Sequence, residues 1–204
     1  MTPLLTGVFA SQISGRLSPP YSLQGNYDAL STVIVPAGGV STITFAGIPQ
    51  TGYSDLQIRA SFQTLRPTYT TDDVYYYYNN DGSGTSYSQH SFTAGVGSSP
   101  TVGAGGGASQ SKNLLQWCAT TTGAAASFQT ACVIDIPEYA NATKFKTSQS
   151  FQGYEINVNA AYAGTLTLGS GNWRSLDKIN SITFTTDSGT GFAEYSTFAL
   201  YGVK

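Results

Sequence analysis

The chain has 204 residues, a formal net charge of −2 at pH 7, and only 10% charged residues. This length suits a single β-sandwich or barrel domain, and the charge balance offers no basic surface that could neutralise nucleic-acid phosphates. A nucleic acid is therefore not an expected partner. Because 14 tyrosines and 23 glycines accompany so few charges, the surface resembles the centre of a protein interface, and association into homo-oligomers or larger assemblies is expected.

Residues 1–26 are expected to form an extended N-terminal arm. This stretch mixes apolar and polar residues without helical periodicity and contains several glycines and prolines. It lacks the basic and compact apolar regions of a secretory signal, so synthesis in the cytoplasm is expected. No apolar run in the chain reaches the length of a membrane-spanning helix, so a membrane is not an expected partner. The apolar side chains of the arm are candidates for contacts with neighbouring subunits: Leu4, Leu5, Val8, Phe9, Ile13 and Leu17.

Residues 27–204 are expected to form one β-sandwich domain. Short β-branched or aromatic runs alternate here with Gly, Pro, Asn and Asp, which is typical of an all-β fold. The clearest half-buried strand is 56–63, whose apolar residues fall on one side. Eleven strands are predicted, over residues 30–35, 41–45, 56–63, 74–78, 87–93, 114–118, 128–136, 145–154, 160–168, 179–185 and 197–203.

Helix signals are limited to one turn over 138–142, which follows Pro137. Strands without helical crossovers form antiparallel sheets, and a jelly roll is the commonest closed arrangement at this length. The predicted fold is therefore a single jelly-roll-like antiparallel β-sandwich with an extended N-terminal arm.

Two stretches are predicted to be loops. Residues 96–111 are almost wholly Gly, Ser and Ala around Pro100, which indicates an exposed flexible loop or one that becomes ordered against a neighbour. Residues 79–84 read Asn-Asn-Asp-Gly-Ser-Gly between two predicted strands, which predicts a hairpin turn. This turn has oxygen donors but lacks the downstream glutamate of a calcium-binding loop.

Four consecutive tyrosines occupy residues 75–78, and strand alternation places two of them on each face. One pair is expected to pack inward, and the other pair, taken as Tyr76 and Tyr78, to be exposed. The exposed pair could fill pockets on a neighbouring subunit, pack on the sheet surface, or stack on sugar rings together with Tyr87.

No catalytic residue, metal or cofactor is predicted. His90 is the only histidine and has no serine in a glycine elbow near it, so a solvent-facing position on a strand is expected. Cys118 and Cys132 could pair if they lie on neighbouring strands, although a cytoplasmic product normally keeps its thiols reduced. Together with one histidine they are too few for a structural zinc site.

The carboxylates are scattered along the chain, so turn capping and strand-end solvation are expected rather than the paired acid and base of a polysaccharide-degrading enzyme. They include Asp72, Asp73, Asp135, Glu138, Glu155 and Glu194.

Several short motifs resemble a group of small, mostly uncharacterised β-sandwich virion structural proteins of tailed bacteriophages. These motifs are ASQISG at 10–15, IPQT at 48–51, LQIR at 56–59, IPEYANATKFK at 136–146, GY at 153–154, INSIT at 179–183 and YSTFALYGVK at 195–204. The resemblance implies a non-enzymatic component of a virion, made in the bacterial cytoplasm, whose partners are the major capsid protein or tail proteins. It implies no catalytic residues.

The predicted shape of the chain favours some positions on the particle over others. A long fibre would need repeats, a coiled coil or a β-helical shaft, and the chain has none of these. A compact sandwich with an apolar arm favours a capsid decoration (cement) protein that stabilises the shell. The alternative is a tail-associated fibre head, adaptor or receptor-binding protein that contacts host glycan.

Overall fold

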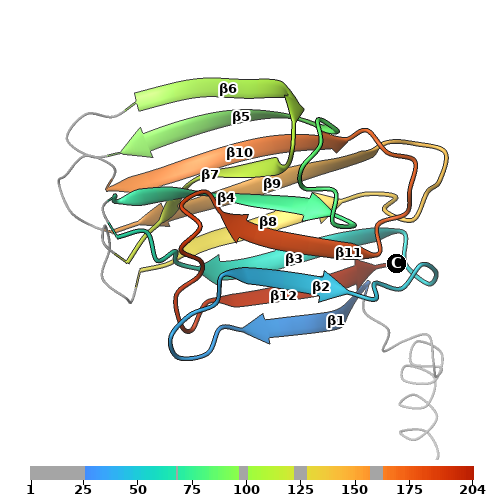
Figure 1. The fold of residues 1–204 in the computed structure, drawn as a ribbon, viewed down its shortest axis with the longest axis horizontal. Helices are drawn as coiled ribbons and strands as arrows, with labels where there is room; N and C mark the ends of the chain where they lie inside the picture. The colour runs from blue at the N-terminus through green and yellow to red at the C-terminus, as the bar shows by residue number, and fades with distance from the viewer. Residues whose placement is uncertain (1–25, 68, 97–100, 122–127, 157–162) are drawn as a thin grey trace, which may run out of the picture.

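The computed structural model describes residues 26–67, 69–96, 101–121, 128–156 and 163–204, and within them the protein consists of twelve strands and turns (Figure 1). The stretch over 137–140 forms turns, so the helical turn predicted over 138–142 is wrong. The strands are β1 (Tyr27–Ile34), β2 (Thr42–Ala46), β3 (Asp55–Phe62), β4 (Thr71–Tyr78), β5 (Tyr87–Val96), β6 (Thr101–Gln110), β7 (Asn113–Ala119), β8 (Thr130–Ile136), β9 (Lys146–Glu155), β10 (Gly164–Trp173), β11 (Ser181–Thr186) and β12 (Thr197–Val203).

The strands form two sheets. The large sheet has eight strands in the order β1-β12-β3-β8-β9-β10-β5-β6, and the small sheet has four in the order β2-β11-β4-β7. All the named strand pairs are antiparallel. The predicted all-β antiparallel sandwich is confirmed.

Each of the eleven predicted runs overlaps a strand, but β6 was not predicted. It lies in the stretch 96–111 that was expected to be a loop, and it pairs with β5. Backbone hydrogen bonds need no side chains, so a chain rich in glycine can still complete a ladder when an ordered neighbour is available. The loop prediction is wrong for residues 101–110.

The turn over 79–84 is not a hairpin, because it joins β4 of the small sheet to β5 of the large sheet. Asn79 and Asn80 do adopt positive φ angles of 51° and 61°, as expected of asparagine in turns. The turn therefore carries the chain from one layer to the other.

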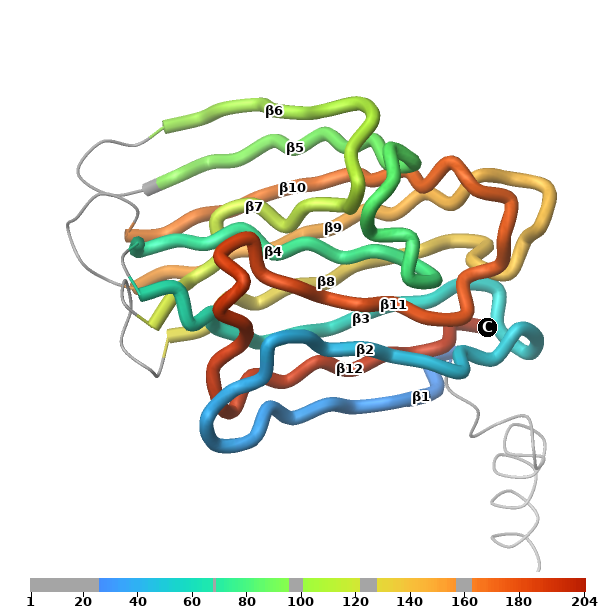
Figure 2. The backbone as a smooth tube through the Cα atoms, in the orientation of Figure 1, coloured from blue at the N-terminus to red at the C-terminus, as the bar shows by residue number. Residues whose placement is uncertain are grey.

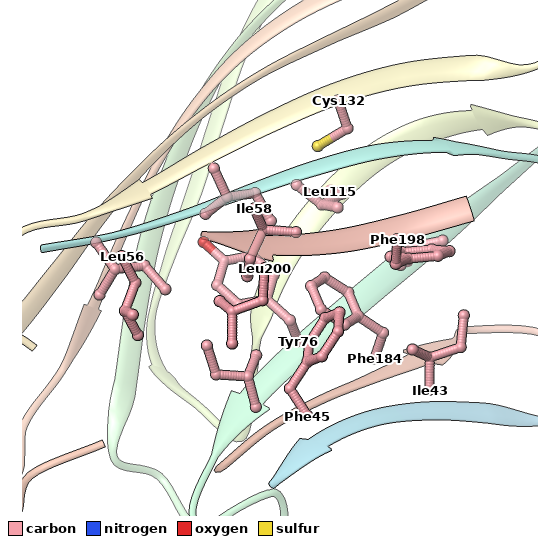
Figure 3. Close-up of a cluster of buried hydrophobic side chains, with 14 of the residues drawn as sticks. Ile43, Phe45, Leu56, Ile58, Tyr76, Leu115, Cys132, Phe184, Phe198 and Leu200 are labelled. Atoms are coloured by element: carbon pink, nitrogen blue, oxygen red, sulfur yellow. The ribbon is translucent and has the colours of Figure 1, made fainter. Parts of the chain in front are cut away.

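An apolar core fills the space between β2, β11 and β4 on one side and β1, β12, β3 and β8 on the other. Figure 3 shows Ile58 and Leu200 of the large sheet and Phe45 and Phe184 of the small sheet pointing into this space, and all four are buried. Phe198 is central, because its ring centroid lies 5.2 Å from those of three other rings: Phe62, Phe184 and Phe192. Burial of this aromatic cluster is the main source of stability in this half of the sandwich.

A different layer lies where β7 packs across β5, β9 and β10 (Figure 2). The side chains buried here are mainly hydroxyls and amides. They are joined by hydrogen bonds such as Thr93 Oγ1 with Thr167 Oγ1 (3.2 Å), Ser91 Oγ to Gln116 Oε1 (3.0 Å) and Thr165 Oγ1 to the Trp117 carbonyl oxygen (3.1 Å). We call this layer the polar seam, and it comprises Ser91, Thr93, Gln116, Ser148, Ser150, Gln152, Thr165 and Thr167.

Candidate functional site

The outer face of the large sheet carries an exposed apolar row. Strand register places Ala104, Phe92, Leu168, Phe151 and Val133 directly side by side on five consecutive strands, from β6 to β8. The three largest are about half exposed, at 51% for Phe92, 53% for Leu168 and 49% for Phe151. A contiguous row of large side chains left half in water is typical of interaction surfaces, whereas single exposed apolar residues are ordinary.

A second, shorter row widens this surface. Leu166, which is 49% exposed, lies between Ala94 and Gly153 in the register, and Ala131 follows on β8. A Cβ on Gly153 would lie 2.6 Å from the Thr165 carbonyl oxygen, so glycine is required there. Because glycine has no side chain, the surface is not filled at this position. The result is a shallow hollow of about 820 Å³. We call the whole surface the outer patch, defined by Phe92, Ala131, Val133, Phe151, Leu166 and Leu168.

A polar band borders the outer patch on the side of the Phe92 row that faces away from Leu166. Register aligns His90, Ser170, Gln149 and Asp135, and these residues line a hollow of about 490 Å³ together with Phe92, Phe151 and other residues of the patch. His90 is exposed on the solvent face of β5, which confirms the position predicted for it. The band offers hydroxyl, amide, imidazole and carboxylate groups beside two aromatic rings.

Arg59 closes the apolar row at its β3 end. Its guanidinium lies 5.2 Å from the ring centroids of both Tyr27 and Tyr201, and its Nε donates to Gln57 Oε1 at 2.6 Å. Gln57 in turn donates from Nε2 to Asp135 Oδ1 at 2.7 Å. The Arg59 guanidinium is thus held over two rings and linked through Gln57 to the Asp135 carboxylate, so it borders the outer patch in a fixed place.

Tyr76, Tyr78 and Tyr87 are not on the surface. Their exposed fractions are 2%, 1% and 0%, so the prediction that they contact a subunit or a glycan from an exposed position is wrong. The alternation itself is present, but Tyr75 and Tyr77 occupy the outward positions of β4. Val74 decides the choice, because it is fully buried and shares its face with Tyr76 and Tyr78.

The buried tyrosines join the core to the polar seam. Tyr76 Oη and Ser148 Oγ form a hydrogen bond of 2.8 Å, and the Tyr78 backbone N–H donates to Tyr87 Oη at 2.9 Å. Tyr87 stacks on Trp173 with a centroid distance of 6.3 Å. Burial raises the pKa of all three phenols above the ordinary value, so they stay neutral packing groups, and the hydroxyls of Tyr76 and Tyr87 also form hydrogen bonds.

The carboxylates Asp72 and Asp73 hold one end of β4. Asp72, whose side chain is fully buried, receives hydrogen bonds from Arg66 Nη1 at 3.3 Å and from Ser188 Oγ at 2.7 Å. Asp73 accepts the Trp117 backbone N–H at 2.8 Å, where Trp117 has a φ of 56°. Burial is the largest cause that raises the pKa of Asp73. These contacts fix the loops at this end of the small sheet.

Asp135 and Glu138 have different surroundings. Asp135 faces the polar band, whereas Glu138 lies in the following turn with its carboxylate 2.6 Å from Lys144 Nζ. The hydrogen bond from Lys144 lowers the pKa of Glu138. Among the described residues, no three His, Cys, Asp or Glu side chains gather closely enough to hold a metal ion.

Cys118 and Cys132 are free thiols, and both are buried. Burial raises the pKa of Cys118 well above its ordinary value and that of Cys132 to about 12. Neither thiol is therefore prepared to act as a nucleophile.

The arm residues predicted as subunit contacts lie outside the described residues. These are Leu4, Leu5, Val8, Phe9, Ile13 and Leu17. In the part of the chain that is described, no helix is long and apolar enough to cross a membrane.

The outer patch was missed by the sequence interpretation. In β10, Thr165 and Thr167 are buried while Leu166 and Leu168 are exposed, which reverses the usual assignment of apolar residues to the interior. The sequence of β9 carried a similar signal, because it alternates Ser148, Ser150 and Gln152 with other residues, and in the structure these three polar side chains occupy the inward positions.

Comparisons with known protein families, with curated proteins and with solved structures each found no match for this chain. The likeness of the sequence motifs to virion proteins of tailed bacteriophages thus stays a prediction.

Proposed function

We propose that this chain is a non-enzymatic structural protein of a tailed-bacteriophage virion, most specifically a capsid decoration protein that stabilises the shell by docking its outer patch on another virion protein. The observation that carries the proposal is the row of half-exposed Phe92, Leu168 and Phe151 across adjacent strands. Fully burying one Phe or Leu side chain contributes about 1.5–3 kcal/mol, so covering the exposed halves of these three and Leu166 would contribute roughly 3–6 kcal/mol.

The strand order supports this proposal. If β5, β6, β9 and β10 are set aside, the remaining strands form two sheets of four, β1-β12-β3-β8 and β2-β11-β4-β7. We infer a jelly roll from this order, because consecutive strands alternate between the sheets as they do in that fold, except at β4 and β7, which both lie in the small sheet. The jelly roll is used in viral capsids and in lectins. The four additional strands extend one sheet and carry Phe92, Phe151, Leu166 and Leu168.

The composition of the surface indicates the chemistry of the partner. Only 10% of the residues are charged, and the nearest cation to the apolar row, Arg59, is engaged with two tyrosine rings and Gln57. A matching surface would be apolar and largely uncharged, as expected of the major capsid protein at a seam between its subunits. The sequence motifs that resemble phage virion proteins point to the same class of partner.

A binding experiment with matched variants tests the proposal. Particles assembled without this protein are mixed with the wild-type chain, with Phe151→Gln/Leu168→Gln, or with Phe145→Gln/Leu176→Gln. The control pair changes the same residue types at similar exposure, 52% and 50%, but outside the outer patch. We expect the patch variant to lose particle binding and the control to bind like the wild type, with unchanged circular dichroism for both. Equal binding of the patch variant would contradict the proposal.

The polar band favours one second candidate, a tail-associated receptor-binding protein that contacts host glycan. Its amide, hydroxyl and carboxylate groups lie in one hollow with Phe92 and Phe151, and aromatic rings beside such groups suit the apolar and hydroxyl faces of a sugar. A glycan array with the wild type and with Gln149→Ala and Phe92→Ala separates the candidates. Binding that both substitutions abolish would favour this role, and an array without any bound glycan would count against it.

A further inference from the structure

The last strand of the large sheet, β6, has an open edge. β6 pairs with β5 along one side, and it is the end member of the sheet. Among the described residues, none pairs with its other side. The backbone N–H and C=O groups along an open edge are a template for another strand.

Most of β6 contains none of the usual devices that block an edge, and its one irregularity lies near the end of the strand, between Gly107 and Gln110, where Ser109 has a φ of 57°. Thr101–Gln110 reads TVGAGGGASQ, without a charge or a proline, and its pairing with β5 is regular from Thr101 to Gly107. The opposite end of the same sheet differs. There, β1 has an irregularity between Ala29 and Ser31, and Asp28 of β1 forms an ion pair of 2.7 Å with Lys204. The sheet is therefore protected at β1 by an ion pair and an irregularity within the strand, whereas the stretch of β6 from Thr101 to Gly107 is open.

Glycine makes β6 costly to keep ordered on one neighbour alone. Four of its ten residues are glycine, and nearly all positions are exposed. A Cβ added to Gly103 would meet no atom within 4 Å. Glycine loses the most conformational entropy when a strand forms, so a second ladder of hydrogen bonds would offset that loss, and the small side chains leave room for it.

We propose that β6 pairs in antiparallel fashion with β6 of a second copy of this chain, about a two-fold axis at Ala104, so that two large sheets join into one. An antiparallel pair of identical edges is self-complementary, as a two-fold interface must be. In this register the two Ala104 residues lie opposite each other, and Val102 of each copy lies opposite Gly106 of the other. The bulkiest apolar residue of the edge thus meets a position without a side chain.

The register is selected by the apolar row. Ala104 is the β6 member of the row that continues through Phe92, Leu168 and Phe151. Pairing at Ala104 aligns the rows of both copies into one stripe across the joined sheet. No charge on β6 opposes the contact. A dimer presents two outer patches to a virion surface at once. This inference therefore deepens the proposed function, and it rests on that function for the role of the joined apolar row.

Charge variants at Ala104 test the pairing in solution. Sedimentation analysis over a wide range of concentrations is expected to show a dimer for the wild type. Ala104→Lys and Ala104→Glu each place like charges opposite each other, and each is expected to raise the dimer dissociation constant about tenfold or more. Mixing the two variants is expected to restore a dimer. Thr32→Lys is the matched control, because Thr32 is exposed in the same row at the β1 edge, and it should remain dimeric.

Cysteine cross-linking tests the register. Ala104→Cys is expected to form an interchain disulfide on oxidation, whereas Val102→Cys should link poorly because its opposite residue is glycine. The native thiols do not interfere, since Cys118 and Cys132 are buried. A wild type that is monomeric, a dimer that persists in both charge variants, or a dimer lost in Thr32→Lys would each overturn the proposal. Because these measurements need no particle, a negative result here leaves docking of the outer patch intact, and failed particle binding leaves the dimer intact.

Discussion

Strands β8 and β9 are neighbours in the large sheet, yet they bury opposite kinds of side chain. β8 turns Ile134 and Ile136 toward the apolar core, whereas β9 turns Ser150 and Gln152 toward the polar seam and leaves Phe151 half in water. The boundary between the two regions runs between these strands. On one side the protein follows the usual inside-outside arrangement, and on the other side the arrangement is inverted.

Because of this inversion, the residues that stabilise the fold and the residues proposed to contact other proteins lie in different regions. A hydrogen bond in the seam contributes about 0.5–1.5 kcal/mol net, whereas a fully buried Phe or Leu contributes about 1.5–3 kcal/mol. The apolar core can therefore provide most of the folding free energy. The extension formed by β9, β10, β5 and β6 buries aromatic rings at its two ends, Tyr87 with Trp173 at one and Tyr154 at the other, and is held between them by hydrogen bonds. It keeps the apolar residues of the outer patch available on the outer face.

Truncation of Phe198 should produce the largest loss of stability. The Phe198 side chain is fully buried among three other rings, so Phe198→Ala is expected to lower the free energy of unfolding by about 3–5 kcal/mol. Urea denaturation followed by tyrosine and tryptophan fluorescence measures it. Phe151→Ala removes the same residue type from the inverted region and should cost about 1 kcal/mol or less. Equal losses for the two variants would remove the energetic distinction between the regions.

Alkaline pH should weaken the protein where the two regions meet. Burial raises the pKa values of Tyr76, Tyr78 and Tyr87, while in the unfolded chain they ionise near 10.0. The native state thus retains protons that the unfolded state has released, so stability must fall as pH rises through that value. The expected loss at about pH 11 is roughly 1.4 kcal/mol for each buried tyrosine.

Phenolate absorbance checks the titration, and urea midpoints at several pH values check the stability. The native protein should show delayed ionisation of some tyrosines until it unfolds. A free energy of unfolding that stays constant from about pH 8 to about pH 11 would contradict the burial of these phenols.

The sequence identified the fold class and nearly all strands because β-branched and aromatic runs bounded by turn residues carry that information locally. β6 has such residues only at Thr101 and Val102, and its strand conformation depends on β5 beside it. Likewise, residues 79–84 were recognisable as a turn, but the sheet reached by the next strand is a tertiary property. Which tyrosines of β4 face inward could have been predicted from Val74. An apolar Val74 is expected to be buried, and strand alternation then places Tyr76 and Tyr78 on the same inner face.

The candidate site was less accessible from the sequence. Alternation in β10 shows that threonines and leucines occupy opposite faces, but not which face packs on β7. Apolar residues are normally assigned inward, and here Thr167 is inside and Leu168 outside. The decision is made by hydrogen-bonding partners on β5 and β7, which lie far away in the chain.

Replacing a glycine by alanine should be tolerated less well in the polar seam than on the open edge strand β6. A Cβ at Gly171 would press on the Asn113 side chain and lie 2.8 Å from Ser148 Oγ, so Gly171→Ala is expected to cost about 1–3 kcal/mol. Gly103→Ala meets nothing nearby and should leave the free energy of unfolding within about 0.5 kcal/mol. Thermal unfolding of both variants measures the difference. A tolerated Gly171→Ala would mean that the seam is loosely packed.

The hydrogen bond between Thr93 and Thr167 gives the smallest expected effect and the most direct measure of how the seam is held. Valine has the shape of threonine without the hydroxyl. Each single replacement by valine should therefore cost about 1 kcal/mol, because it leaves the other buried hydroxyl short of a partner. The double variant should cost less than the two single losses combined, with a coupling of about 0.5–1 kcal/mol.

Thr93 Oγ1 also donates weakly to Gln116 Oε1, at 3.5 Å, so Thr93→Val should be the costlier of the two single changes. Urea denaturation of the four proteins closes the cycle. Strictly additive losses would show that the two hydroxyls act independently. In that case the shape of the two threonines, rather than the hydrogen bond between them, would account for their contribution to the contact of β5 with β10.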